Sequence, residues 1–540
     1  MERKTKRITV PFKGGDAANE QKRIDILDTT LRDGAQAEGV HFSVSDKLSV
    51  CRAIDEMGVK YIEAGNPGSN PKDEEFFEAA KSIKLKHARL TAFCSTKRKG
   101  VDIEDDISIQ KTIAADTKCV AMFGKVWDLH VDRVLGMTLA ENLCAVRETI
   151  EYFKQYGKEL IFDAEHFFDG YKSNPEYAMQ VLEAADRAGA DVLCLCDTNG
   201  AAMPDEVFDI VKKAKQRFPG AIIGIHCHND TGCAVANSML AVKAGATHVH
   251  GTFNGIGERC GNANLCTILP NLQLKWGYKC VGGNLRRLRY TAIRVAEIAN
   301  VSIPREKPYV GKSAFAHKGG MHIDGVDKIT RSFEHISPEA VGNERRFLLS
   351  EISGKRAVLL KIADIKPGLS KDSPEVEQIL GKLKAMEHFG YQFEAAEASF
   401  ELMVKRELGL LEPHFTPVMY KTSGEFPAVN ASQRANAMIQ IDVGTNAEIT
   451  AAVGDGPIHA LDQALRKALC VFYPELTKVH LIDYKVRVLE ADNATGSTVR
   501  VLIESSDGKR KWTTVGASTD IIEASFLALV DSFEYKLSSE

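Results

Sequence analysis

Residues 187–199 read Arg-Ala-Gly-Ala-Asp-Val-Leu-Cys-Leu-Cys-Asp-Thr-Asn, and this stretch is the key to the fold. A helical segment closes at Gly189, an apolar run follows, and polar residues begin at Asp197. Two other junctions, at 56–59 and 243–246, again place a glycine between a helical segment and a strand-like run. Glycine commonly ends helices because it adopts the left-handed backbone conformation without strain. The pattern predicts a repeated helix-then-strand unit.

The same unit extends in both directions along the chain. Short apolar runs separated by amphipathic stretches are predicted as strands at 23–27, 59–63, 89–94, 119–123, 160–164, 191–196, 221–228 and 247–253. Strands that alternate with helices imply a parallel sheet. Eight such units in about 270 residues match a (β/α)₈ TIM barrel in number and length. Ser45 is the expected cap of the helix that Gly58 stops, and Pro204 suits the first turn of another helix.

The remaining chain divides into parts of different character. We expect an N-terminal extension at 1–22, the catalytic barrel at 23–290, a helical linker with subdomains at 291–415, and a C-terminal regulatory domain at 430–537. Within the linker, 371–390 is a predicted helix, and 412–427 reads as a break. The C-terminal part shows strands at 437–443, 447–453, 485–490, 498–505 and 511–515, with helices at 458–472 and 520–535. This predicts a duplicated α+β (βββα) domain.

Each half of that domain carries a glycine turn before its helix, Val-Gly-Asp-Gly at 453–456 and Val-Gly-Ala-Ser at 515–518. A helix N-terminus of this kind can bind a carboxylate. The alternative is that the glycines only permit the turn.

Composition excludes several classes of protein. The 540 residues are 44% hydrophobic and 26% charged, which is ordinary for a globular protein. With 69 Lys plus Arg against 73 Asp plus Glu, the net charge is −4, so neither nucleic acid nor an anionic membrane is the expected partner. The basic N-terminus lacks the apolar region of a secretory signal, and no run approaches the ~18 apolar residues of a membrane span. Twelve cysteines without a paired motif suggest reduced thiols and a cytoplasmic location.

In a parallel barrel the chemistry lies where the strands end. His226 and His228 are two residues apart at the end of a predicted strand, so their imidazoles point to the same face. Asp33 follows the first strand and can add a carboxylate, and Asn262 can add an amide oxygen. Two imidazoles, a carboxylate and waters suit a six-coordinate divalent cation. They can instead be ordinary polar residues of the rim.

A second alternating pair, His248 and His250, lies several residues before the turn that ends the last strand. We rank it second as a metal pair, because packed or hydrogen-bonded core histidines give the same pattern.

Other polar residues of the same rim have two interpretations each. Arg32 can stabilise an oxyanion beside the metal, or form a salt bridge with Glu63 or Glu165. Thr198 can bind a substrate carboxylate, or cap a helix. Glu165 itself can polarise a substrate, or form an ion pair.

His317 and His322 lie outside the barrel in a Gly-rich segment, 316–324. A histidine on such a segment can act as a base that reaches the site when substrate binds, or it can be a surface residue.

Three motifs together resemble the isopropylmalate, homocitrate and citramalate synthase family of metal-dependent Claisen-type synthases. They are Asp-Thr-Thr-Leu-Arg-Asp-Gly at 28–34, His-Cys-His-Asn-Asp at 226–230 and Gly-Ile-Gly-Glu-Arg-Cys-Gly-Asn at 255–262. They fall in order at the predicted strand ends, and the resemblance extends over nearly the whole chain. Within the family, 39–43 and 65–73 are most similar to the citramalate synthase group.

The resemblance implies an acyltransferase that condenses acetyl-CoA with pyruvate and water to (R)-citramalate and CoA, in isoleucine biosynthesis. Implied metal ligands are Asp33, His226, His228 and Asn262, around Mn²⁺ or Mg²⁺, with Zn²⁺ as an alternative. The implied catalytic residues are Arg32, Glu165 and His322, and the implied substrate-binding residues are Arg32, Thr198 and Gln36. The family further implies a homodimer and inhibition by isoleucine at the C-terminal domain.

One residue departs from the family pattern. Relatives often carry a tyrosine where this chain has Phe333, so that hydroxyl is absent or supplied elsewhere, with Tyr309 as a candidate. The identity of the base that deprotonates acetyl-CoA therefore stays open.

Other activities fit parts of the same pattern. An isopropylmalate or homocitrate synthase would take a bulkier keto acid in a pocket expected near Phe93, Met122, Asp163 and Glu165. An acyl-CoA lyase shares the barrel but should lack the regulatory domain. A non-haem iron oxygenase also uses two histidines and a carboxylate. A non-enzymatic amino-acid sensor would not need the polar rim.

Overall fold

The computed structural model describes residues 22–348, 354–363, 365–424, 435–489 and 496–539. They form two compact units. The barrel unit contains the described residues up to Phe315 and the segment Glu334–Arg345. The C-terminal unit contains Ala316–Phe333 and the described residues from Arg346 onward. The predicted N-terminal extension, except for Lys22, lies outside the described residues.

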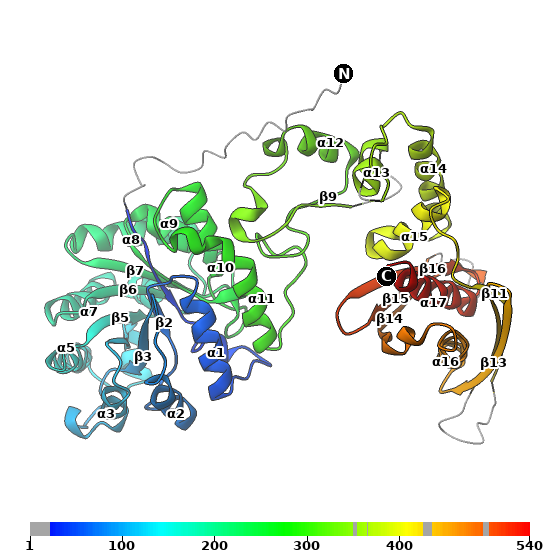
Figure 1. Cartoon of the computed structure of the whole chain (residues 1–540). Helices are drawn as coiled ribbons and strands as arrows, with labels where there is room; N and C mark the ends of the chain where they lie inside the picture. Colours follow the sequence, from blue (N-terminus) through cyan, green and yellow to red (C-terminus); the bar gives the residue numbers. More distant parts are fainter. Residues whose placement is uncertain (1–21, 349–353, 364, 425–434, 490–495, 540) are drawn as a thin grey trace. The chain divides into compact units, whose positions relative to one another are not determined.

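The barrel unit is a closed parallel barrel of eight strands in sequential order, as the sequence predicted (Figure 1). Its strands are β1 (Asp25–Asp28), β2 (Tyr61–Glu63), β3 (Arg89–Ser95), β4 (Cys119–Lys125), β5 (Glu159–Glu165), β6 (Val192–Asp197), β7 (Ile222–Cys227) and β8 (His248–Gly251). The barrel closes where β1 pairs with β8, with Asp28 opposite Gly251.

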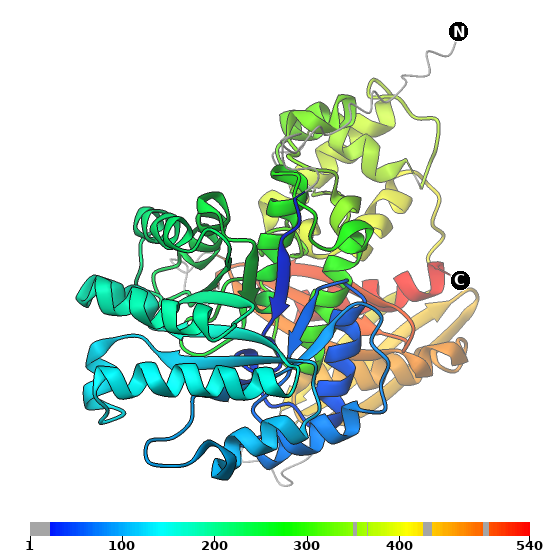
Figure 2. The ribbon, with the colours of Figure 1, turned by 90° about the vertical axis from the view of Figure 1, so that its left-hand side faces the viewer.

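Helices surround these strands on the outside (Figure 2). They are α1 (Val44–Asp55), α2 (Pro71–Ala80), α3 (Ile107–Ala114), α4 (Asp128–Arg133), α5 (Leu139–Gln155), α6 (Phe167–Ser173), α7 (Pro175–Arg187), α8 (Pro204–Arg217), α9 (Ala234–Ala244), α10 (Leu265–Pro270) and α11 (Leu288–Ile298). Pro204 begins α8, as predicted. The predicted cap Ser45 was wrong. Ser43 caps α1, because its hydroxyl accepts from the Asp46 amide while the Asp46 carboxylate accepts from the Ser43 amide.

Two apolar cores hold the barrel together. The larger lies between the strands and the outer helices and includes Phe76, Phe153 and Phe162, all fully buried. The smaller fills the lumen with Leu27, Tyr61 and their neighbours. Because the lumen is packed with side chains, only the rim at the strand ends is left for chemistry.

The C-terminal unit begins with short helices and a two-stranded parallel sheet. These are β9 (Ala316–His317), α12 (Gly320–Lys328), β10 (Arg346–Phe347), α13 (Lys355–Ile362), α14 (Pro374–Phe389) and α15 (Glu397–Glu407). Two βββα repeats follow: β11 (Thr416–Gly424), β12 (Ala435–Val443), β13 (Asn446–Gly454) and α16 (Pro457–Leu469); then β14 (His480–Val488), β15 (Val499–Ser506), β16 (Lys511–Ser518) and α17 (Ile521–Ser538). The duplicated α+β fold predicted from the sequence is confirmed.

One strand of this domain was missed. Strand β11 occupies most of the segment 412–427 that read as a break, and it contains Pro417 and Gly424. It is an edge strand with an irregular register between Pro417 and Met419. Edge strands and bulges tolerate proline, which explains the misleading signal. Glu490, the predicted end of another strand, lies outside the described residues.

The glycine turns of the two repeats have a packing reason. A Cβ on Gly454 would lie 2.6 Å from the backbone nitrogen of Ala460 in α16, and one on Gly516 would lie 2.0 Å from the carbonyl oxygen of Ala524 in α17. Both helices therefore approach their strands too closely for any side chain. Within the described part of the chain, no helix combines the length and the apolar character needed to cross a bilayer.

Candidate active site

A cavity of about 290 Å³ opens at the carboxyl ends of the barrel strands. It is lined by Arg32, Asp33, Gln36, Phe93, Phe123, Asp163, Glu165, Cys196, Thr198, His226, His228 and Glu258. Several of these residues come from sequence positions far apart and meet only because the barrel closes. Met122, expected in the lining, is fully buried and does not line this cavity.

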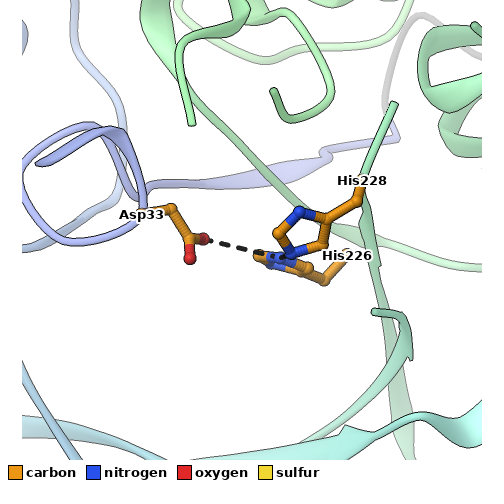
Figure 3. Close-up of side chains that lie close together, drawn as sticks. All are labelled: Asp33, His226 and His228. Atoms are coloured by element: carbon orange, nitrogen blue, oxygen red, sulfur yellow. Dashed lines mark hydrogen bonds and ion pairs between the residues drawn. The ribbon is translucent and has the colours of Figure 1, made fainter. Parts of the chain in front are cut away.

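Asp33, His226 and His228 point toward one another in this cavity (Figure 3). Nε2 of His226 lies 3.4 Å from Nε2 of His228 and 3.5 Å from Oδ2 of Asp33. The Asn262 amide lies 3.3 Å from both His226 Nε2 and Asp33 Oδ2. None of the four residues is more than 5% exposed. The structure thus brings the four predicted residues together. Ligand atoms of Asp33, His226 and His228 lie close to one another, whereas Asn262 presents its amide nitrogen to them and its Oδ1 lies beside Gly257.

Local backbone pairing puts Asn262 in this position. His228 and Asn262 form an isolated antiparallel bridge, so the loop after β8 folds back against the end of β7. Gly257 makes this possible, because a Cβ there would lie 1.9 Å from Oδ1 of Asn262. Gly257 of the 255–262 motif therefore leaves the space that the Asn262 side chain occupies.

The charge state of the cluster suits a cation. Burial lowers the pKa of His226 to about 3 and also lowers that of His228, so both imidazoles are neutral near pH 7. Burial opposes the charge of Asp33, but the positive charge of Arg32 holds the pKa of Asp33 below its usual value. Two neutral imidazoles and one carboxylate are a typical ligand set.

The spacing of the ligand atoms also suits a cation. Ligands about 2.2 Å from an ion and at right angles to each other lie about 3 Å apart, close to the separations seen here. The residues therefore fit a divalent metal ion.

Arg32 is held beside this cluster by two carboxylates. Its Nη1 lies 2.7 Å from Oδ1 of Asp33, its Nε donates to Glu63, and its guanidinium lies over the Phe93 ring at 3.9 Å. The bridge to Glu63 was one of two alternatives for this arginine, and it coexists with a position in the cavity lining. Glu63 is fully buried, and burial raises its pKa to about 7 despite Arg32.

Thr198 and Glu165 also line the cavity, with structural contacts of their own. The Thr198 hydroxyl accepts a hydrogen bond from the backbone amide of His166 at 2.9 Å, and Thr198 caps no helix. His166 has a left-handed backbone with φ 55°. Glu165 forms an ion pair with Lys125 on the neighbouring strand at 2.5 Å. Glu165 therefore forms an ion pair and also lines the cavity, so both of its interpretations remain open.

His322 belongs to the C-terminal unit, whereas the rim residues belong to the barrel unit. It lies exposed on α12, and its ring stacks on Phe333 with centroids 4.3 Å apart. Phe333 is the residue at which a departure from the family pattern was expected, and it directly contacts the predicted histidine. Tyr309, considered as a substitute hydroxyl, is buried, donates to Asn271 at 2.5 Å and does not line the cavity.

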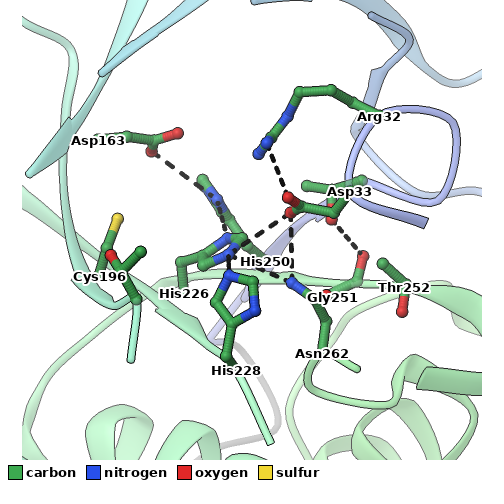
Figure 4. A network of polar contacts seen from close by, with 12 residues as sticks. Arg32, Asp33, Asp163, Cys196, His226, His228, His250, Gly251, Thr252 and Asn262 are labelled. Carbon is green, nitrogen blue, oxygen red and sulfur yellow. Dashed lines mark hydrogen bonds and ion pairs between the residues drawn. The ribbon is translucent and has the colours of Figure 1, made fainter. Parts of the chain in front are cut away.

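The competing pair His248 and His250 lies inside the barrel. Both side chains are fully buried, and their rings are 4.9 Å apart. Figure 4 shows His250 beside His226, within the polar network that includes Arg32 and Asp163. Sequence reasoning did not assign this network, because it depends on which side chains share a level of the barrel.

A second cavity of about 300 Å³ adjoins the first. The two share Arg32, Gln36 and Phe93 in their linings. Because Gln36 lines both cavities, it lies where they meet, and its side chain is exposed. The rest of the lining is Leu31, Ala35, Val40, His41, Phe42, Lys47, Asn66, Ser69, Asn70, Lys72 and Asp73. Most of these residues fall in 39–43 and 65–73, the two segments that resemble the citramalate synthase group, although the sequence did not indicate that they form a cavity.

Comparison with protein-family models divides the chain into three parts, of which the middle one includes residues of both compact units. Residues 23–295 match the HMGL-like family, 309–390 match the homocitrate synthase post-HMGL domain-like family, and 394–537 match the LeuA allosteric (dimerisation) domain. The last match is the regulatory domain that a simple lyase was expected to lack.

Curated relatives match over nearly the whole chain. The (R)-citramalate synthase of Aquifex aeolicus is 51% identical over 520 residues, which cover 96% of this chain and 98% of that protein. The (R)-citramalate synthase of Geobacter sulfurreducens is 48% identical, covering 95% and 97% respectively. Among solved structures, the HMG-CoA lyase of Bacillus subtilis aligns with 53% of this chain and 97% of its own at 22% identity and a TM-score of 0.47.

Proposed function

The chain belongs to the (R)-citramalate synthase family, and we propose that its barrel condenses acetyl-CoA with pyruvate and water to give (R)-citramalate and free CoA. The observation that carries this proposal is the buried cluster of Asp33, His226 and His228 next to Arg32 in one rim cavity. The reaction needs an activated keto carbonyl and a base for the thioester methyl group. The rim supplies candidates for both tasks.

We assign Asp33, His226, His228 and Asn262 as the residues that hold a divalent cation, Mn²⁺ or Mg²⁺ in preference to Zn²⁺. When bound, such an ion supplies Lewis-acid activation of the keto acid. The neutral imidazoles and the charged Asp33 carboxylate leave the ligand set with a single negative charge.

The other residues then divide the remaining work. Arg32 stabilises negative charge that develops on the keto oxygen, because its guanidinium is already fixed by Asp33 and Glu63. Thr198 donates its hydroxyl proton to the keto acid carboxylate, while its oxygen accepts from the His166 amide. Gln36 contacts substrate at the mouth.

Proton transfer is proposed for Glu165 and His322. One base removes a methyl proton from the acetyl thioester, the resulting carbanion attacks the keto carbon, and water then hydrolyses the thioester to release CoA. Glu165 lines the cavity and is held by Lys125. His322 would have to come from the C-terminal unit.

The second cavity offers acetyl-CoA a route to the keto acid. That cavity shares Arg32, Gln36 and Phe93 with the first, and its lining adds amide and hydroxyl side chains and Lys72. We propose that the thioester enters there and reaches the keto acid beside Arg32.

Pyruvate is favoured over a bulkier keto acid by the aromatic wall of the cavity. Phe93 and Phe123 stack at 5.2 Å and both line the space next to Arg32. The alternative, isopropylmalate or homocitrate synthesis, requires room for a longer side chain on that wall.

The substrate assignment is tested by CoA release from acetyl-CoA with pyruvate, 2-oxobutyrate, 2-oxoisovalerate and 2-oxoglutarate. Turnover strongest with pyruvate, with citramalate as the product, is expected. A preference for 2-oxoisovalerate or 2-oxoglutarate would reassign the pathway, and release of thiol with none of them would contradict a synthase.

The LeuA allosteric domain supports effector binding and a dimer. We propose that the effector is isoleucine, the end product of a citramalate route, and that the protein is a homodimer joined through this domain. On β13, Ile449 and Val453 are 59% and 48% exposed, four residues apart on the same face of the sheet. Helix α16 packs against this sheet and buries its other face, so a partner subunit would cover the exposed one.

A further inference from the structure

His226 has a close neighbour at each of its two ring nitrogens (Figure 4). Nε2 faces His228 and Asp33, as described above. Nδ1 lies 3.4 Å from Nδ1 of His250, and the two rings are perpendicular with centroids 5.5 Å apart. This second contact is internal to the barrel and is not part of the proposed ligand set.

The chemistry of imidazole fixes the direction of that contact. A histidine that gives its Nε2 lone pair to a cation carries its remaining proton on Nδ1. A buried N–H of this kind needs an acceptor, and in metal sites the acceptor orients the ligand ring. Among the described residues, the acceptor within reach of that proton is Nδ1 of His250, which puts the proton of His250 on Nε2, a buried atom without a hydrogen-bond partner in the described structure.

We propose that His250 is a positioning residue for the metal site: it accepts the Nδ1 proton of His226 and so presents the Nε2 lone pair of His226 to the cation. This role rests on the cation site of the proposed function. It adds a fifth side chain, from strand β8, to the residues on which metal binding depends.

The barrel holds His250 rigidly enough for this role. The residue pairs with Leu27 in the strand ladder, and its side chain is fully buried. Sγ of Cys194 lies 3.7 Å from its Nδ1. As a neutral acceptor it adds no negative charge to the ligand it supports, whereas the more usual carboxylate partner makes the ligand more basic. The cation is thereby kept a stronger Lewis acid.

Nδ1 of His250 could instead bind a metal ion, and experiment can distinguish that arrangement from the positioning role. Asp163, Cys194 and His250 place three ligand-type atoms within 4.8 Å of one another, which is a second candidate site for an ion. Nδ1 of His250 cannot bind an ion and accept from His226 at once. Its shortest contact is with His226, at 3.4 Å, against 3.7 Å to Cys194 and 3.8 Å to Asp163. The two arrangements therefore make different predictions for metal binding, because only one of them needs the contact between His250 and His226.

The experiment measures Mn²⁺ binding to the full-length, metal-free protein by the loss of the free-ion signal in electron paramagnetic resonance. His250→Leu removes the acceptor, and His250→Gln retains one. His248→Leu is the matched control, because that histidine is equally buried on the same strand and none of its recorded contacts is to a metal ligand. Thermal melting of each metal-free variant shows whether it folds.

The wild type should bind one ion per chain at this site. His250→Leu should weaken binding about 10- to 100-fold, His250→Gln should recover most of that loss, and His248→Leu should bind as the wild type does. Equal losses in His250→Leu and His248→Leu would overturn the proposal, as would unchanged binding in His250→Leu. A second ion in the wild type that Cys194→Ala abolishes would also overturn it.

A variant of a proposed metal ligand, His228→Leu, distinguishes failure of the positioning role of His250 from failure of the proposed metal site. Loss of binding in His228→Leu with normal binding in His250→Leu would overturn only the positioning role. Normal binding in both variants would overturn the metal site itself.

Discussion

At the scale of single residues, the candidate site depends on how buried charges are arranged. Arg32 carries a full charge into the cavity because Asp33 and Glu63 both contact it. Removing a charge from such a network leaves the others unpaired, which costs far more than the loss of an exposed ion pair. The planar guanidinium also presents several donors in fixed directions, which an ammonium does not.

Arg32→Lys is therefore expected to keep the fold and lose activity. Lysine retains the charge but cannot contact Asp33, Glu63 and substrate at once. We expect kcat/KM to fall by about 10²- to 10³-fold, the typical loss of one oxyanion-stabilising donor. Arg217→Lys, at an exposed ion pair with Glu183, is the control and should retain wild-type kinetics. A change of less than about threefold in Arg32→Lys would contradict the assigned role.

His248 gives a prediction on pH. Burial lowers its pKa to about 4, and neither of its ring nitrogens has a hydrogen-bond partner in the described structure. Its ordinary pKa is about 6.5. As the pH falls from 6.5 toward 4, His248 therefore becomes protonated in the unfolded chain but stays neutral in the folded chain. Its contribution to stability is thus present above pH 6.5 and lost below it.

His248→Leu should remove this acid sensitivity. Between pH 7 and pH 5 the wild-type barrel should lose about 2 kcal/mol more unfolding free energy than the variant, from about 1.4 kcal/mol per pH unit below 6.5. Urea unfolding at the two pH values measures it. The same loss in both proteins would show that His248 already titrates normally in the folded barrel.

Much of the site could be predicted from sequence periodicity, but the contacts made by Glu63 and His250 inside the barrel could not. The spacing of His226 and His228 on one strand implies a common face, and Asp33 follows another strand end, so their meeting could be predicted. Glu63 was considered only as a salt-bridge partner, and the contact of His250 with His226 was not foreseen. Those contacts depend on the register between strands, which a single sequence does not reveal.

At the scale of elements, local rules explain both the successes and the failures. The eight barrel strands were predictable because helices with clear ends separate them. Strand β11 was not, because Pro417 and Gly424 are turn residues that an edge strand happens to tolerate. The choice of Ser43 over Ser45 as the cap of α1 depended on its reciprocal pairing with Asp46.

The two glycine turns give a prediction at this scale. Gly454→Ala should destabilise the C-terminal domain by about 1–3 kcal/mol, because its Cβ would collide with the backbone of α16. Gly456→Ala is the matched control, two residues away, with open space around its Cβ position. Calorimetric melting of both variants is the measurement. Equal melting temperatures would show that close packing is not why a glycine stands at 454.

At the scale of the whole molecule, the chain joins a catalytic barrel to a duplicated domain of the LeuA allosteric type. The chemistry proposed here needs only rim residues of the barrel and a histidine from the C-terminal unit. Regulation then requires that effector binding to the LeuA-type domain alter what the rim can do. This division makes the two functions separable by experiment.

Isoleucine should inhibit CoA release by the full-length protein, and removal of residues 430–540 should abolish that inhibition. Leucine and valine serve as controls for the specificity of the effector. Retained catalysis with unchanged inhibition after this truncation would contradict the assignment of the effector to the C-terminal domain.

Metal dependence is tested most directly by pyruvate-dependent CoA release from protein that is stripped of metal with a chelator and then titrated with Mn²⁺. We predict no turnover in the stripped protein and full recovery as one ion per barrel binds, with no recovery in Asp33→Asn. Undiminished turnover in the stripped protein, or equal recovery in Asp33→Asn, would contradict a metal-dependent synthase built on Asp33, His226 and His228.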